Sequence, residues 1–92
     1  MIRSFRHSGL ERFFRTGSKA GIQPQHAKRL QLQLAQLNVA SGPNDMAAPP
    51  WGLHPVKGVL EGHWAVWVDE NFRLTFRFEG KNVVEVDYRD YH

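Results

Sequence analysis

Three separate segments of this sequence carry side chains suited to proton transfer or to phosphate binding. Residues 53–58 (LHPVKG) hold a histidine and a lysine, residues 72–78 hold two arginines, and the chain ends on a carboxylate, a phenol and an imidazole. The side chains concerned are His54, Lys57, Arg73, Arg77, Asp90, Tyr91 and His92. Imidazole, carboxyl and phenol groups exchange protons, and guanidinium forks match phosphate oxygens. Each segment alone also resembles an ordinary solvated loop, strand face or chain end, so the elements that position them decide whether they act together.

Several other chemistries are excluded by what the sequence lacks. There is no cysteine, which rules out a disulfide scaffold, a thiolate zinc site and a cysteine nucleophile. The histidines show no HExxH or paired ligand spacing, and there is no Gly-rich phosphate loop or Gly-x-Ser-x-Gly turn. We therefore expect neither a metal ion nor an organic cofactor. Membrane insertion and secretion are not expected either, because no long apolar run and no signal-peptide core are present.

Charge is distributed unevenly along the 92 residues. The formal net charge is +3, but residues 1–46 carry seven lysines and arginines against two acids, whereas residues 47–92 carry five against seven. The basic residues of the first half are Arg3, Arg6, Arg12, Arg15, Lys19, Lys28 and Arg29. A basic half suits a polyanion or an acidic partner, and a solvated basic surface is the alternative. At this length we expect one domain covering residues 1–92.

The first half of the chain has helical spacing. Residues 8–16 predict a short helix, since Ser8 and Glu11 form a capping-box pattern and apolar residues recur three and four apart. Residues 24–40 predict a second helix, with a proline at its start and one apolar stripe that faces the core. Residues 1–5 alternate weakly and suggest a short first strand.

The second half of the chain changes to a period of two. Residues 64–68, 72–78 and 84–88 alternate apolar and polar side chains and are separated by turn residues, and residues 53–57 add a short strand limited by a proline. This pattern predicts a small twisted antiparallel sheet with one apolar face. The expected fold class is α+β, with the N-terminal strand and two helices packed on that sheet. Arg73 and Arg77 then point away from the helices.

The last strand raises a problem of orientation. If it runs straight, Tyr91 falls on the polar face with Arg89, whereas Asp90 and His92 fall on the apolar face with Val84 and Val86. Side chains from the two faces can contact the same substrate only if the strand ends or bulges before it reaches these residues. We therefore predict a break near residue 89.

Six sequence blocks, in this order, give the chain a resemblance to a known family. They are residues 2–5 (IRSF), 9–14 (GLERFF), 53–58 (LHPVKG), 62–68 (GHWAVWV), 71–78 (NFRLTFRF) and 86–92 (VDYRDYH). Together they resemble the RelE/ParE superfamily of toxin–antitoxin toxins, and within it the HigB-type, or plasmid-killer, branch. Phe72 stands where this pattern has tryptophan, which we interpret as a core substitution that keeps an aromatic ring.

The resemblance implies a RelE-like, microbial RNase-like domain that cuts translated messenger RNA in the ribosomal A site. It implies a partner as well, a helix-turn-helix antitoxin of the HigA type that neutralises the toxin and represses the operon. Operator DNA is then contacted only through the antitoxin complex. A cytoplasmic location follows from the ribosomal target, and the absence of cysteine fits it.

The resemblance also implies a set of active residues. At the family's active positions this sequence has His54, Lys57, Arg73, Asp90, Tyr91 and His92. Metal-free RNA cleavage needs a base for the ribose 2′-hydroxyl, cations for the phosphorane charge and an acid for the leaving 5′-oxygen. Arg73 and Lys57 suit the cations, and His54 or His92 suits a proton carrier. Asp90 can accept a proton or orient a histidine, and Tyr91 can stack on a base. Base and acid are not assigned individually.

The basic residues of the first half, together with Arg77, then suit contact with ribosomal RNA. Two rival functions fit the same chain. One is a ParE-like toxin that inhibits DNA gyrase and cuts nothing, and the other is a non-catalytic nucleic-acid-binding module that uses the arginine face. The proton-carrying side chains favour the ribonuclease, because a protein that only binds gyrase needs none.

Overall fold

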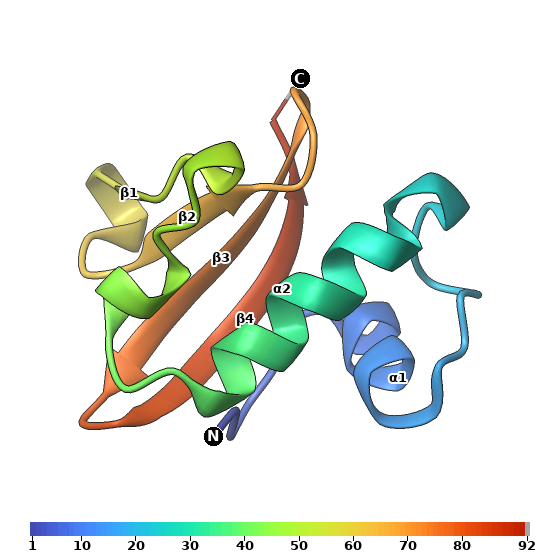
Figure 1. Cartoon of the computed structure of the whole chain (residues 1–92), viewed down its shortest axis with the longest axis horizontal. Helices are drawn as coiled ribbons and strands as arrows, with labels where there is room; N and C mark the ends of the chain where they lie inside the picture. The colour runs from blue at the N-terminus through green and yellow to red at the C-terminus, as the bar shows by residue number, and fades with distance from the viewer. Residues whose placement is uncertain (92) are drawn as a thin grey trace.

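The computed structural model describes residues 1–91 and arranges them as two helices against one face of a four-stranded antiparallel sheet (Figure 1). The helices are α1 (Ser8–Thr16) and α2 (Ala27–Val39). The strands, which are neighbours in chain order, are β1 (His54–Pro55), β2 (Trp64–Trp67), β3 (Phe72–Glu79) and β4 (Asn82–Asp90). The predicted α+β fold, with both helices on the apolar face of the sheet, is confirmed.

Helix α1 covers the predicted residues, but a different residue caps its start. Nδ1 of His7 accepts a hydrogen bond from the backbone N–H of Leu10 at 2.9 Å. The predicted capping role of Ser8 is therefore wrong, and Ser8 is the first helical residue. Gly17 ends the helix in the left-handed conformation with φ 80°, which glycine adopts without steric cost.

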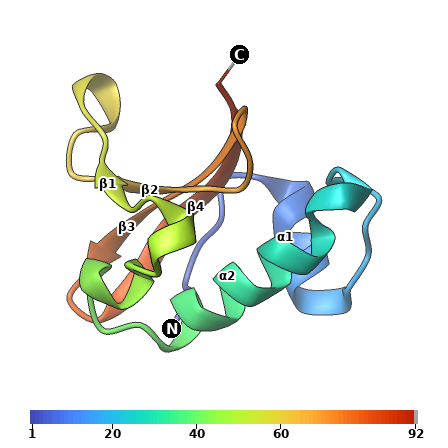
Figure 2. The same cartoon turned by 45° about the horizontal axis from the view of Figure 1, so that its top comes forward.

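Helix α2 supplies much of the apolar contact with the sheet (Figure 2). Leu30, Leu34 and Leu37, which belong to the predicted stripe, are fully buried against the apolar side chains of β2, β3 and β4. The predicted helix over residues 24–40 is confirmed except that its first turn, Pro24–His26, is a 3-10 turn. No helix in the described part of the chain is both long enough and apolar enough to span a lipid bilayer.

The N-terminal segment runs beside β4 but forms only isolated bridges to it. The strand expected over residues 1–5 is therefore wrong, although the segment does pair with the sheet. Ile2 and Phe5 make isolated parallel bridges to Val83 and Val86. These contacts recur every three residues on both segments, whereas a regular ladder has a side-chain period of two. The segment therefore pairs with only part of the edge of β4.

Two glycines set the distance between the start of α1 and the loop before α2. A Cβ atom added to Gly9 would lie 2.7 Å from the Cα atom of Gly21, so there is no room for a side chain. We expect Gly9→Ala and Gly21→Ala each to lower the free energy of unfolding by about 1–3 kcal/mol, because backbone must move. Gly42→Ala is the control, since its Cβ would have no neighbour within 4 Å. Equal losses for all three variants in urea unfolding would contradict this account.

Strands β3 and β4 pair with one irregularity. Thr75 lies opposite Asp87 and Arg77 lies opposite Val84, so one residue of β3 faces two residues of β4. This is a β-bulge, and Glu85 within it has a positive φ of 56°. The bulge shifts the alternation of β4, so Val84 lies on the face away from the helices. The prediction that Val84 belongs to the apolar face is wrong for this reason.

Beyond the bulge, β4 pairs regularly to its end. Arg73 lies opposite Arg89, and Phe72 lies opposite Asp90. The strand end predicted near residue 89 is confirmed, since β4 ends at Asp90, but no bulge lies there and the pairing is regular up to that residue. As a result Asp90 lies on the same face as Tyr88, which is the face toward the helices.

Candidate active site

The face of the sheet turned away from α1 and α2, called the outer face below, carries two rows of side chains across the strands. The first row consists of the cross-strand partners His54, Ala65, Thr75 and Asp87. The second row consists of Trp67, Arg73 and Arg89. Directly opposite residues on neighbouring strands have Cβ atoms about 4.5–5.5 Å apart. His54 and Arg73, from distant parts of the sequence, therefore share one face.

Arg73 lies on the outer face near the start of β3, and its guanidinium group is held in place. The Nη1 atom donates to the carbonyl oxygens of Asp69 and Phe72 at 2.8 and 3.1 Å. The guanidinium carbon lies 5.4 Å from the centre of the Trp67 ring and 5.6 Å from that of Tyr91. Within residues 1–91 the Nε and Nη2 atoms make no hydrogen bond. This free pair of donors is suited to bind two phosphate oxygens at once.

His54 is half-buried at the edge of the sheet, and the backbone fixes its ring. Nδ1 lies 2.8 Å from the carbonyl oxygen of Gly52. Because a carbonyl oxygen only accepts hydrogen bonds, Nδ1 carries the hydrogen, and in the neutral ring Nε2 has an unprotonated lone pair. This tautomer is the one that a general base needs. Lys57 is exposed two residues beyond the end of β1, in the same short segment.

The C-terminal residues divide between the two faces of the sheet. The backbone N–H of Tyr91 donates to the carbonyl oxygen of Asn71 at 2.6 Å, which places the chain end beside the β2–β3 turn, as Figure 1 shows. Its ring reaches the outer face next to Arg73. Asp90 lines a pocket on the helix side together with His7 and Gln23, so the structure does not bring it to Arg73. The catalytic role predicted for His92 lies outside the described residues.

Comparison with known proteins identifies the chain that carries this site. A family model described as the RelE-like toxin of the type II toxin–antitoxin system HigB matches residues 3–92. The chain belongs to this family of HigB-like toxins. Endoribonuclease HigB of Proteus vulgaris is 35% identical over 92 residues, which cover the whole of both chains. The predicted family is thereby confirmed, and a type II toxin has an antitoxin as its partner.

A hydrogen-bonded network that begins at the buried His26 and ends at the exposed Asp69 lies next to Arg73, and it was not predicted from the sequence. His26, at the start of α2, contacts the Tyr88 hydroxyl through Nδ1 and the Asp69 carboxylate through Nε2, both at 2.5 Å. Asp69 also accepts two backbone N–H groups of the β2–β3 turn. The network thus ties α2, β4 and the turn whose backbone holds Arg73. Its members are 43 and 62 residues apart, so no local spacing could have indicated it.

The network predicts a loss of stability in acid. Desolvation alone would raise the pKa of Asp69, but the hydrogen bonds from His26 and from the backbone outweigh it and hold this pKa below its ordinary value of 3.8. A lowered carboxyl pKa stabilises the fold above the ordinary pKa, and this stability is lost as the pH falls through the lowered value. We expect Asp69→Asn to cost about 1 kcal/mol at pH 7, discounted for the partial exposure of the carboxylate.

The measurement is urea unfolding of the wild-type toxin and of Asp69→Asn at pH 7 and at a pH well below 3.8. The difference in unfolding free energy between the two proteins should be full at pH 7 and should shrink in acid, where both side chains are neutral. A difference that stays constant across this range would show that the charge of Asp69 contributes nothing to stability.

Other arginines near this face differ from Arg73 in what they contact. Arg77 donates to the carboxylates of Glu85 and Glu79 at 2.8 and 3.1 Å, and the bond to Glu85 is the larger cause of a raised Arg77 pKa. Arg29 donates to two backbone carbonyl oxygens, one of them in β2. Both of these predicted RNA-binding side chains are therefore engaged within the toxin, whereas Arg73 keeps two donors without a partner among the described residues.

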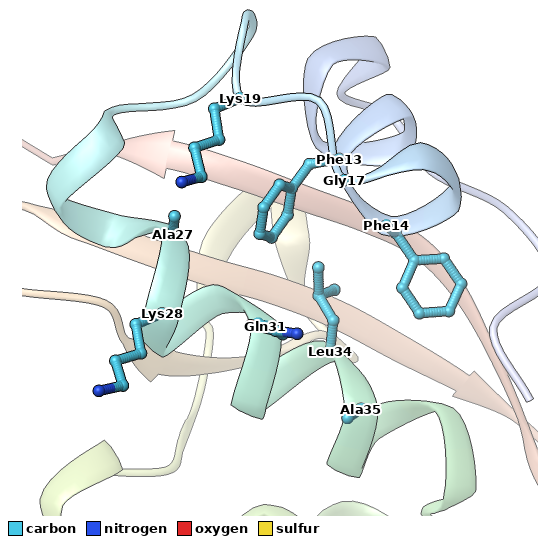
Figure 3. A pocket seen from close by; sticks show the side chains of 9 residues that line it. All are labelled: Phe13, Phe14, Gly17, Lys19, Ala27, Lys28, Gln31, Leu34 and Ala35. Atoms are coloured by element: carbon cyan, nitrogen blue, oxygen red, sulfur yellow. The ribbon is translucent and has the colours of Figure 1, made fainter.

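The remaining basic residues of the first half lie on the N-terminal segment, the two helices and the loop between them. Those exposed to solvent are Arg3, Arg6, Arg12, Arg15, Lys19 and Lys28. Lys19 and Lys28 line a groove between α1 and α2 with a volume of about 440 Å³. Figure 3 shows the side chains of Phe13 and Leu34 lying between the two helices, with both lysines at one end. The side chain of Arg73 extends from the other face of the sheet, although Arg29 of α2 reaches the end of β2 and lines a pocket with it.

Sequence reasoning missed one prominent residue of the outer face. Trp67 is 47% exposed and lies directly opposite Arg73. The signal was present in the alternation of residues 64–68, which puts this tryptophan on the polar face, where a large aromatic residue is unusual. No group of three imidazole or carboxylate side chains in the described chain is arranged to hold a metal ion.

Proposed function

We propose that this toxin is a ribosome-dependent endoribonuclease that cuts translated messenger RNA without a metal ion. The observation that carries the proposal is the outer face, which presents Nε2 of His54, the free donors of Arg73 and the ring of Tyr91 on one side of the sheet. The relative from Proteus vulgaris that matches over its whole length is named an endoribonuclease, which supports the same activity.

In the proposed reaction, Nε2 of His54 takes the proton of the ribose 2′-hydroxyl, and the 2′-oxygen attacks the adjacent phosphorus. The bond from phosphorus to the 5′-oxygen breaks, which leaves a 2′,3′-cyclic phosphate and a 5′-hydroxyl. Arg73 stabilises the negative charge that grows on the phosphorane, and Lys57 supplies a second cation. The departing 5′-oxygen receives a proton from an acid, for which Tyr91 and His92 are the candidates.

The partners follow from the same proposal. We propose that the antitoxin is a helix-turn-helix protein of the HigA type, and that the toxin reaches operator DNA only through it. The ribosome and its message are the target, so the toxin acts in the cytoplasm. The exposed basic residues of the first half suit contact with ribosomal RNA, which presents phosphates as a continuous surface.

The decisive experiment maps RNA ends after a short induction of the toxin without its antitoxin. The proposal expects new, codon-phased cuts within translated messages. In a purified system, toxin stripped of metal with a chelator before the assay should cut ribosome-bound message as fast as untreated toxin, and it should leave free message intact. Growth arrest with intact messages and DNA damage would favour a ParE-like gyrase inhibitor instead. Absence of arrest would leave a nucleic-acid-binding module.

A further inference from the structure

The exposure of the Trp67 side chain on the outer face needs a physical explanation. Trp67 ends β2 with 47% of its surface exposed, although burial of an indole is strongly favourable. Its backbone is firmly held, since its carbonyl oxygen accepts hydrogen bonds from Arg29 Nε and Gln33 Nε2 at 3.2 and 2.9 Å. The exposure of the ring therefore does not come from fraying at the end of β2.

The Trp67 ring is supported from below by a glycine. Gly52 has a positive φ of 57°, and a Cβ atom there would lie 3.0 Å from Cδ2 of the Trp67 ring. The indole thus packs against bare backbone at Gly52, lies near the guanidinium group of Arg73 and still leaves about half of the residue open to solvent. A ring held in this way loses little conformational entropy when a ligand binds to it.

The two aromatic rings beside Arg73 have the arrangement of a binding site for a dinucleotide step. Trp67 and Tyr91 flank the guanidinium group at 5.4 and 5.6 Å, and both rings are more than 40% exposed. In RNA, each phosphate is likewise flanked by two bases. A pocket of about 400 Å³ opens between Trp67, Arg73 and Arg29, which is in the size range of small-ligand sites.

We propose that Trp67 is a stacking platform for an unpaired RNA base next to the phosphate that Arg73 binds. Every nucleic-acid base has a π-face, and base–aromatic stacking is a common means by which proteins hold single strands. The inference rests on the proposed ribonuclease function and adds a substrate-contacting residue to it. Trp67 acts by binding the base and takes no part in proton transfer.

The test is a cycle of two changes, one in the toxin and one in the RNA. Wild-type toxin, Trp67→Leu and Trp67→Phe are compared on ribosomes carrying an intact message and on messages made abasic at either nucleotide that flanks the cut. Single-turnover cleavage rates are measured. We expect Trp67→Leu to cut the intact message about tenfold more slowly than the wild type. Trp67→Phe keeps an aromatic plane and should stay within about twofold of the wild type.

The abasic message separates stacking from a merely structural effect. On the message that lacks the stacked base, the wild type should slow about tenfold and Trp67→Leu should slow no further, because the partner of the ring is already gone. Leu32→Ala is the control for loss of an exposed apolar side chain, since Leu32 is 61% exposed on α2. It should match the wild type on every message.

The outcomes distinguish this inference from the proposed function. A wild type that cuts no ribosome-bound message overturns the ribonuclease and the platform together. A wild type that cuts, with Trp67→Leu equally fast on the intact message, overturns the platform alone. A tenfold loss in Trp67→Leu that persists unchanged on both abasic messages also overturns it, because it would then come from distortion of the sheet. Thermal unfolding of each variant checks that the fold is retained.

Discussion

Replacing Arg73 with alanine is expected to slow cleavage of ribosome-bound message by about 10²–10³-fold, the usual cost of removing one preorganised donor to a developing negative charge. Within residues 1–91, the Nε and Nη2 atoms of Arg73 are a free pair of donors on the outer face beside the β2–β3 turn. Arg73→Lys keeps the charge but loses the two-donor geometry, so we expect an intermediate loss. Single-turnover rates on ribosomes carrying a defined message measure both effects.

The matched control is Arg77→Ala, on the same strand and the same face. Arg77 is already bound to Glu85 and Glu79, so its charge is neutralised within the toxin. We expect this variant to keep a cleavage rate within a few-fold of the wild type. If both alanine variants lose activity equally, then the overall positive charge of the strand matters and not the free donors of Arg73.

Local sequence patterns predicted the elements of this fold well because each element follows one hydrophobic period. The stripe Leu30, Leu34 and Leu37 marks a helix whose buried face has a period near 3.6, and the alternation in residues 72–78 marks a strand with a period of two. Both patterns arise from burial against the same core. Their agreement explains why the layers of the fold follow from the sequence alone.

The positions of single side chains were harder to predict because they depend on contacts between distant segments. A bulge at Glu85 inserts one residue into β4 and reverses the face of Val84. Once the bulge has absorbed the irregularity, regular pairing carries Asp90 to the helix side. The alternation that Asp90 shares with Val86 and Tyr88 already indicates this face for a strand that runs straight up to residue 90.

The candidate site shows the same division between local and distant information. The residues that the family resemblance picks out include His54 and Arg73, and the structure brings both to the outer face. Their orientation comes from groups that carry no sequence signal, namely the backbone carbonyls of Gly52 and Asp69. The hydrogen bond between His26 and Asp69, which holds the β2–β3 turn, is likewise visible only in the folded chain.

Replacing His54 with glutamine is expected to slow cleavage by about 10²–10⁴-fold, the usual contribution of a positioned proton carrier. The carbonyl oxygen of Gly52 fixes Nδ1 as the protonated nitrogen and leaves Nε2 to accept the proton of the 2′-hydroxyl. Glutamine can still donate an N–H to that carbonyl, but it cannot take up a proton at neutral pH. The variant therefore separates the chemistry from the packing of the side chain.

Stability and substrate binding provide the controls for His54→Gln. We expect its unfolding free energy to stay within about 0.5 kcal/mol of the wild type, because the backbone hydrogen bond is kept. Binding to programmed ribosomes should also be unchanged, since the loss falls on the chemical step and not on association. A variant that still cuts at a tenth of the wild-type rate or faster would remove His54 from the role of base. The proton would then have to leave through another group of the outer face, and Lys57, two residues beyond β1, is the next to be replaced.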